Sequence, residues 1–120
     1  MLSLSPAVKL WYCPEAVDMR LGFDGLFHLV ANRLKADPLS GHLFIFHNQR
    51  RSALKMLWWE AGGFCLLYKR LAKGRFRLPP VEGGMTRVNR EQLRLLLDGF
   101  DLTSVRRLPR WNPEEKTSAK

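Results

Sequence analysis

The stretch from His42 to Pro80 constrains the fold more than any other part of this 120-residue chain. It contains four short runs rich in strand-favouring residues, at 42–47, 53–60, 64–71 and 76–78. The gaps between these runs are short and hold glycines or polar turn residues. Strands this close in sequence pair antiparallel, because a parallel pair needs a long crossover. The stretch therefore predicts an antiparallel β-meander, whose last short run is an edge strand because Pro79-Pro80 ends it.

Weaker patterns flank the meander on both sides. Residues 7–13 predict a further strand that joins the sheet. Apolar residues at helical spacing predict a helix from about Gly25 to Lys35, with Asp24 as its N-cap. Asn89 opens a second helix, and Gln92 three residues later completes a capping box. We therefore expect an α+β fold, a small antiparallel β-meander of four to five strands with two helices packed on one face.

The length and the 46% hydrophobic content predict one globular domain. We expect this domain to occupy residues 1–101 and residues 102–120 to form a flexible basic C-terminal tail, because periodicity ends there. The sequence shows neither a signal peptide nor an apolar run of about 18 residues. Cys13 and Cys65 are far apart and fit a reducing compartment. A cytoplasmic location without membrane contact is expected.

Positive charge is concentrated in the meander. This stretch carries net +7 of the chain's formal +9, and aromatic residues alternate with its cations. A cationic surface with aromatics is typical of proteins that bind a phosphate backbone. The predicted nucleic-acid-binding residues are the eight cations of the stretch: Arg50, Arg51, Lys55, Lys69, Arg70, Lys73, Arg75 and Arg77.

Signatures of catalysis do not occur in the sequence. Phosphate-binding, dinucleotide-binding, zinc-protease and serine-hydrolase motifs are missing. The histidines and cysteines do not share a metal-ligand spacing. Glu60 is the one acid within the basic meander, whereas a Mg²⁺-dependent nuclease needs several carboxylates. We therefore expect a non-enzymatic protein without a cofactor or a metal site.

Three functional interpretations are possible, and they assign different roles to the residues of the meander. The preferred one is a DNA-binding protein whose cations form a basic β-sheet surface, on the face away from the helices or at the hairpin tips. The second is a protein–protein adaptor, docking on a partner or self-associating as a homodimer, with Trp58 and Trp59 as anchors. Adjacent strand residues face opposite sides, so at least one tryptophan is expected away from the helix-covered face. The third is a metal-dependent nuclease acting alone.

Four sequence blocks resemble a known family. They are DMRLGFDGLFHLV (18–30), DPLSGHLFIFHNQRR (37–51), LKMLWWEAGGFCLLYKRLAKGRFRLP (54–79) and EQLRLLLDGFD (91–101). In this order, and over roughly residues 7 to 101, the chain is similar to the TnpB accessory protein of bacterial insertion sequences of the IS-66 type, their second open reading frame. It has Leu21 where the family block DMRKGFDGL carries lysine, so the family's cation at this position is not carried over to this chain.

The resemblance implies a role in transposition of an insertion sequence. Proteins of this kind are encoded beside a separate, larger DDE-type transposase, which would perform the strand cutting. The family supplies no catalytic residues to transfer to this chain. The expected partners are accordingly DNA, most simply the ends of the element, and the transposase of the same element.

Overall fold

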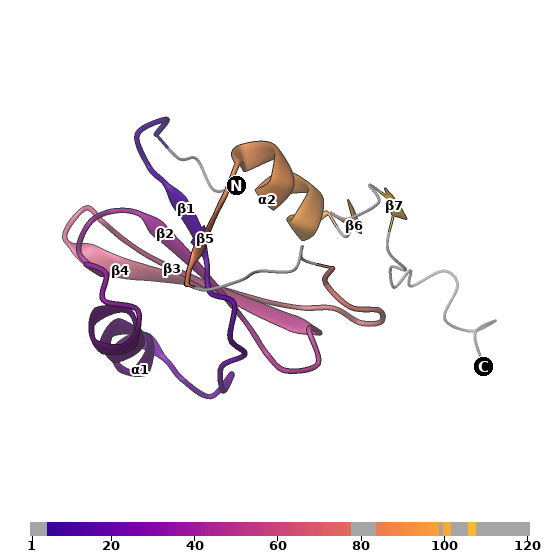
Figure 1. Ribbon diagram of the computed structural model, residues 1–120, viewed down its shortest axis with the longest axis horizontal. Coiled ribbons are helices and arrows are strands. Elements are labelled where there is room, and N and C mark those ends of the chain that lie inside the picture. The colour runs from indigo at the N-terminus through magenta and orange to yellow at the C-terminus, as the bar shows by residue number, and fades with distance from the viewer. Residues whose placement is uncertain (1–4, 78–83, 99, 102–105, 108–120) are drawn as a thin grey trace.

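Three consecutive strands form the antiparallel part of the sheet (Figure 1). They are β2 (Leu43–His47), β3 (Ala53–Glu60) and β4 (Gly63–Arg70). The register of β3 with β4 runs without interruption from Ala53 opposite Arg70 to Glu60 opposite Gly63. The first three predicted runs are therefore confirmed as a meander. The computed structural model describes residues 5–77, 84–98, 100–101 and 106–107, and residue 78 of the fourth run lies outside them.

The far side of the sheet is built from segments distant in sequence. The strand order is β4-β3-β2-β1-β5, where β1 is Leu10–Tyr12 and β5 is Thr86–Val88. Strand β1 runs parallel to β2 and antiparallel to β5. Residues 76–77 form no strand, so the prediction of a fourth meander strand is wrong for the described part of that run. The fifth strand of the sheet is instead β5, which the sequence analysis did not predict.

The connection between the parallel strands carries the first helix. Helix α1 (Phe23–His28) continues directly into a π-helix, η1 (Leu29–Arg33). The predicted helix is confirmed, but the predicted N-cap is wrong. Gly22 occupies the cap position without a side-chain hydrogen bond, and Asp24 lies in the first turn, where its charge favours the helix dipole.

Helix α2 (Arg90–Leu97) begins as predicted. The Asn89 side chain accepts a hydrogen bond from the Gln92 backbone N–H at 2.7 Å, and the Gln92 side chain accepts one from the Asn89 backbone N–H at 2.9 Å. Each residue thus satisfies an amide that the first helical turn leaves without a partner. The capping box is confirmed.

The two helices cover opposite faces of the sheet, α1 below and α2 above in Figure 1. The α2 face buries Leu10, Tyr12, Leu43, Ile45, Leu54, Met56, Trp58, Phe76, Val88, Leu93 and Leu96. The α1 face buries Cys13, Leu26, Val30, Phe44, Phe46 and Leu57. The prediction of both helices on one face is therefore wrong, although the α+β class is confirmed. The cause is visible in β2, whose continuous apolar run is typical of a strand buried on both sides.

Two short strands follow α2. Residues Phe100–Asp101 (β6) pair antiparallel with Arg106–Arg107 (β7). This pairing reaches into the segment predicted as a C-terminal tail, and the remainder of that segment lies outside the described residues. Across the described ranges, none of the helices is long and apolar enough to cross a membrane.

Candidate nucleic-acid interface

Two segments that are far apart in sequence lie side by side at one end of the sheet. The first is the turn 48–52 between β2 and β3, and the second is segment 71–77 after β4. The Leu71 N–H donates to the Ser52 carbonyl at 2.8 Å, and the Phe76 N–H donates to the Arg51 carbonyl at 2.6 Å. Together these segments and the last residue of β4 expose six cations, which we call the basic end: Arg50, Arg51, Arg70, Lys73, Arg75 and Arg77.

The turn that carries two of these cations is ordered by Asn48. Its side-chain oxygen accepts the backbone N–H groups of Ser52 at 2.9 Å and of Ala53 at 3.1 Å. Its amide nitrogen donates to the Ser52 hydroxyl at 3.0 Å. An asparagine that bonds its own turn in this way replaces the backbone bonds that a loop otherwise lacks. The two arginines are therefore presented by a fixed loop.

Phe76 anchors the second segment. Its side chain is fully buried in the core beneath α2, while Arg75 and Arg77 on either side of it are exposed. Gly74 at φ +86° allows the chain to turn back toward the sheet just before this anchor. Burying one aromatic side chain therefore directs the two flanking arginines outward.

Arg51 adopts a backbone conformation that is unusual for its residue type. Its φ is +59°, in the left-handed region that disfavours residues with a Cβ. The Arg51 guanidinium also lies close enough to Tyr12 to influence its ionisation. Burial raises the pKa of the Tyr12 hydroxyl, and the positive charge of Arg51 opposes that rise. The Tyr12 ring stacks on His47 with centroids 5.4 Å apart. Arg51 of the basic end thus lies near a stacked pair of rings, Tyr12 and His47.

No carboxylate within the described residues forms an ion pair with the basic end. The ion pairs of the described chain are Arg20–Asp18, Arg33–Glu15, Arg94–Glu91 and Arg94–Asp98. All of them involve α1, α2 or the loop before α1. The cations of the basic end consequently remain available to an anion from outside.

Elsewhere on the surface, arginines that pair with acids lower the pKa of those acids. Hydrogen bonds from Arg20, through its side chain and its backbone N–H, lower the pKa of Asp18 to about 2. The Arg94 guanidinium likewise lowers the pKa of Glu91. Arg20 and Arg94 are therefore already committed to partners in the same chain.

Two of the eight predicted interface residues are used inside the fold. Lys55 is only 7% exposed, and its Nζ donates to the Leu21 carbonyl at 2.7 Å and lies 4.8 Å from the Tyr68 ring centroid. The Lys69 Nζ donates to the Leu97 carbonyl at the last residue of α2, where a cation complements the helix dipole. The structure does not bring Lys55 or Lys69 to the basic end.

The two predicted anchor tryptophans point to opposite faces, as expected. Trp58 is 7% exposed on the α2 face, and its indole N–H donates to Glu60 at 2.8 Å. Trp59 is half-buried on the other face, against Phe64 with ring centroids 5.0 Å apart. Because both faces carry a helix, the tryptophans do not form a shared exposed patch, and Trp58 is not accessible to a partner.

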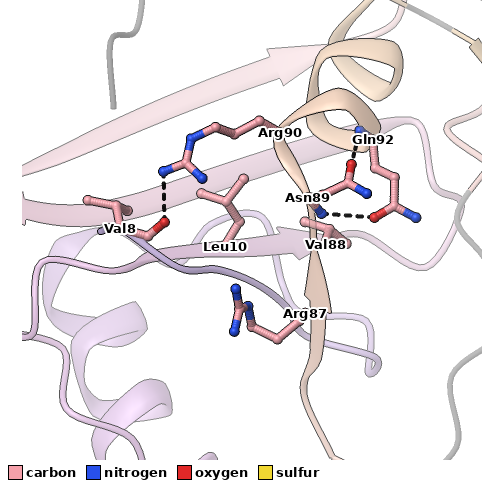
Figure 2. Close-up of a pocket in the computed structure, with 7 residues that line it drawn as sticks. All are labelled: Val8, Leu10, Arg87, Val88, Asn89, Arg90 and Gln92. Atoms are coloured by element: carbon pink, nitrogen blue, oxygen red, sulfur yellow. Dashed lines mark hydrogen bonds between the residues drawn. The ribbon is translucent and has the colours of Figure 1, made fainter. Parts of the chain in front are cut away.

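A second group of arginines lies at the opposite side of the sheet, around a pocket of about 260 Å³ (Figure 2). The pocket is lined by Val8, Leu10, Arg87, Val88, Asn89, Arg90 and Gln92. Arg90 donates to the Val8 carbonyl at 2.9 Å and also to the Ser5 carbonyl. The Arg87 guanidinium lies 5.5 Å from the Trp11 ring centroid. These two arginines tie the start of the chain to β5 and α2, unlike those of the basic end.

The titratable side chains that the structure describes can be compared with the arrangement that a metal site requires. Within the described ranges, no three or more His, Cys, Asp or Glu residues lie close enough together to hold a metal ion. Cys13 is buried, and burial raises the pKa of its thiol, which makes the thiol a weaker nucleophile.

Sequence reasoning missed the residues that position the basic end. Asn48 and Phe76 were not identified as important, and residues 76–78 were interpreted as a strand. A signal for Phe76 exists in Arg75-Phe76-Arg77, where a single large apolar residue between cations after a glycine is typical of a buried anchor. The predicted antiparallel meander already places the gaps 48–52 and 72–74 at one end of the sheet, but nothing local in the sequence indicates that the chain after them turns Phe76 into the core.

Comparison with known proteins identifies one family and two similar proteins. Residues 8–107 match the family described as IS66 Orf2 like protein. The chain is 42% identical over 101 residues to the uncharacterized protein y4hO of Sinorhizobium fredii (strain NBRC 101917 / NGR234), covering 84% of this chain and 88% of that protein. It is 36% identical over 109 residues to the uncharacterized protein y4jC of the same strain, covering 91% and 93%. No solved structure matches the chain.

Proposed function

The chain belongs to the IS66 Orf2-like family, and on that premise we propose that it is a non-enzymatic accessory protein in transposition of IS66-type elements that binds DNA through its basic end. Strand cleavage is assigned, as the family resemblance implies, to a separately encoded DDE transposase. The expected site of action is the cytoplasm, on the ends of the element.

One observation carries the DNA-binding proposal. Six exposed cations from two segments meet at one end of the sheet, and none of them has a carboxylate partner among the described residues. Phosphate contacts by Lys and Arg dominate the affinity of proteins for DNA. Arginine in particular binds phosphate through two parallel hydrogen bonds.

The geometry restricts the proposed contact to the end of the sheet. The sequence left two places for the cations, the uncovered face of the sheet or the hairpin tips, and helices cover both faces. Loop residues at strand ends are a common place for binding groups, because the sheet behind them is rigid. The proposal therefore rests on the turn 48–52 and segment 71–77 and leaves out Lys55 and Lys69.

The dependence of DNA affinity on salt tests the proposal. If about five phosphates are engaged, a plot of log affinity against log salt concentration should have a slope of roughly −4 to −5. The combined substitutions Arg50→Gln, Arg75→Gln and Arg77→Gln should make this slope about 3 units shallower and weaken binding at low salt. Fluorescence anisotropy with labelled duplexes of element-end and unrelated sequence measures the affinity at each salt concentration and hence the slope.

The matched control removes three arginines that are already paired. Arg20→Gln, Arg33→Gln and Arg94→Gln change the net charge by the same amount but leave the basic end intact. We expect nearly the same salt slope as in the unaltered protein. A binding curve that ignores salt, or an equal loss of affinity in both triple variants, would contradict a localised DNA site.

The second proposed role is docking on the transposase. Trp59 and Phe64 support it, because they form a half-buried aromatic pair near the β3–β4 turn, at the end of the sheet opposite the basic end. Trp59→Ala should then weaken capture of the transposase while leaving the salt slope for DNA unchanged. Equal capture by the variant and the unaltered protein would remove this role for Trp59.

A further inference from the structure

Strand β4 (Gly63–Arg70) lies at one edge of the described sheet. It runs for eight residues and pairs only with β3 among the described strands. Its register with β3 is continuous from Gly63 to Arg70, without a bulge. An edge of this length exposes a row of backbone N–H and C=O groups that can pair with another strand.

The side chains of β4 do not protect this edge. Natural edge strands are usually blocked by charges, prolines or bulges, but residues 63–68 contain no charge and no proline. Phe64, Leu66 and Leu67 are only half-buried, and Tyr68 is 49% exposed. Part of the apolar surface of β4 is therefore left without a covering group from the described chain.

We propose that β4 pairs antiparallel with β4 of a second copy of this chain, joining the two sheets across a two-fold axis at Leu66. In this register Leu66 lies opposite Leu66, Phe64 lies opposite Tyr68, and Cys65 lies opposite Leu67. Every cross-strand pair in the centre is then apolar, and the pair Phe64–Tyr68 is aromatic on both sides, a combination that stabilises antiparallel pairs. A two-fold contact of this kind uses the same surface on both copies.

Charge selects the antiparallel direction. Lys69 and Arg70 are the two charged residues of β4 and stand at its end, whereas Gly63 begins it. Antiparallel pairing about Leu66 therefore places Lys69 of one copy opposite the uncharged Gly63 of the other. Parallel pairing would instead place Lys69 and Arg70 beside the same residues of the second copy, and like charges in adjacent strands repel.

The dimer leaves the basic ends exposed. Each lies where its own β4 ends, so an antiparallel pair directs the two basic ends toward opposite ends of the joined sheet. Self-association is therefore compatible with DNA binding but does not depend on it. Failure of either proposal can be recognised without the other, because the tests of the dimer contain no DNA.

A disulfide trap tests the proposed register. The trap variant carries Leu66→Cys and Cys65→Ser in the full chain. Identical residues on the two-fold axis of an antiparallel pair have Cα atoms about 5 Å apart, within the range of a disulfide. We expect mild oxidation to convert this variant to a covalent dimer, visible on a non-reducing gel. Tyr68→Cys and Ser40→Cys in the same background should stay monomeric on the gel.

Light scattering coupled to size-exclusion chromatography supplies the second measurement. The unaltered protein should elute with twice the mass of one chain, and Leu66→Lys should shift it toward one chain because two charges would meet on the axis. A single-chain mass at every concentration, together with no trap at position 66, overturns the proposal. Equal trapping at positions 66 and 68 would indicate parallel pairing and overturn the register. If the β4 amides of a monomer were protected from hydrogen exchange, another segment of the same chain would pair with β4, and the proposal would be wrong.

Discussion

The basic end and the surface around the helices carry the same kinds of side chain but arrange them differently. Around the helices, Arg20 in the loop before α1, Arg33 in η1 and Arg94 in α2 each contact a carboxylate of the same chain. At the basic end the six cations contact no carboxylate among the described residues. Exposed ion pairs add little stability, so pairing matters here mainly because it removes cations from the set that an external anion can reach.

The comparison also separates charge from position. Lys55 belongs to the same basic stretch of sequence as Arg51, yet its ammonium group is buried against the Leu21 carbonyl. Net charge alone thus overstates the surface that is available for binding. The variants below test whether the basic end is distinct from the rest of the molecule, beginning with the largest expected effect.

Phe76→Ala should have the largest effect on the basic end. Removing a fully buried aromatic ring should lower the free energy of unfolding by about 3–5 kcal/mol, and it should release Arg75 and Arg77 from their fixed positions. Urea unfolding followed by tryptophan fluorescence measures the stability, and anisotropy measures the affinity for DNA.

The control for this variant is Phe23→Ala. Phe23 is 46% exposed, so its loss should change the free energy of unfolding by no more than about 0.5 kcal/mol and leave DNA binding intact. If Phe76→Ala were as mild as Phe23→Ala, segment 71–77 would not be anchored by its aromatic residue.

Lys55→Met and Lys73→Met should show opposite profiles. Methionine at position 55 keeps the apolar stem but leaves the Leu21 carbonyl without its donor, which should cost about 1–2 kcal/mol of stability and leave DNA affinity unchanged. Methionine at the exposed position 73 should change stability by less than about 0.5 kcal/mol but weaken DNA binding. The same unfolding and anisotropy assays apply, and a loss of affinity in Lys55→Met as large as in Lys73→Met would contradict the burial argument.

Arg51→Gly should raise stability while it weakens DNA binding. Glycine adopts a φ of +59° without the Cβ clash, so the free energy of unfolding should rise by up to about 1 kcal/mol, while the lost charge lowers DNA affinity. Ala61 has a similar φ of +53° at the other end of the sheet. Ala61→Gly should therefore raise stability alike without weakening DNA binding, and a fall in affinity equal to that of Arg51→Gly would show that backbone relaxation matters more than charge.

Local signals predicted the parts of the fold that are encoded locally. The meander follows from short runs separated by turn residues, and the start of α2 follows from Asn89 and Gln92, whose bonds close within one helical turn. The parallel pairing of β1 with β2 was not predicted, because it joins residues more than thirty positions apart. Strand β5 was missed for the same reason, since it pairs with β1 rather than with a sequence neighbour.

The candidate site was predictable in composition and only partly in place. Six of the eight cations of the basic stretch lie at the basic end, as the density of Arg and Lys suggested. The sequence left open whether they lie on an uncovered face of the sheet or at the hairpin tips, and the burial of both faces leaves the end of the sheet. The unbroken apolar run Leu43–Phe46 carried that information, since a strand with one exposed face would alternate.

The location of β5 and α2 near the end of the described chain has a consequence for synthesis. Every cation of the basic end has left the ribosome once Arg77 has emerged, but the lid over Leu43, Ile45 and Met56 is encoded by residues 86–97. A nascent chain stopped between these points would carry the complete set of charges on a sheet with one bare apolar side. Such a product would aggregate rather than act as a shortened DNA binder, so a premature stop in this interval would eliminate the protein's activity and not merely trim it.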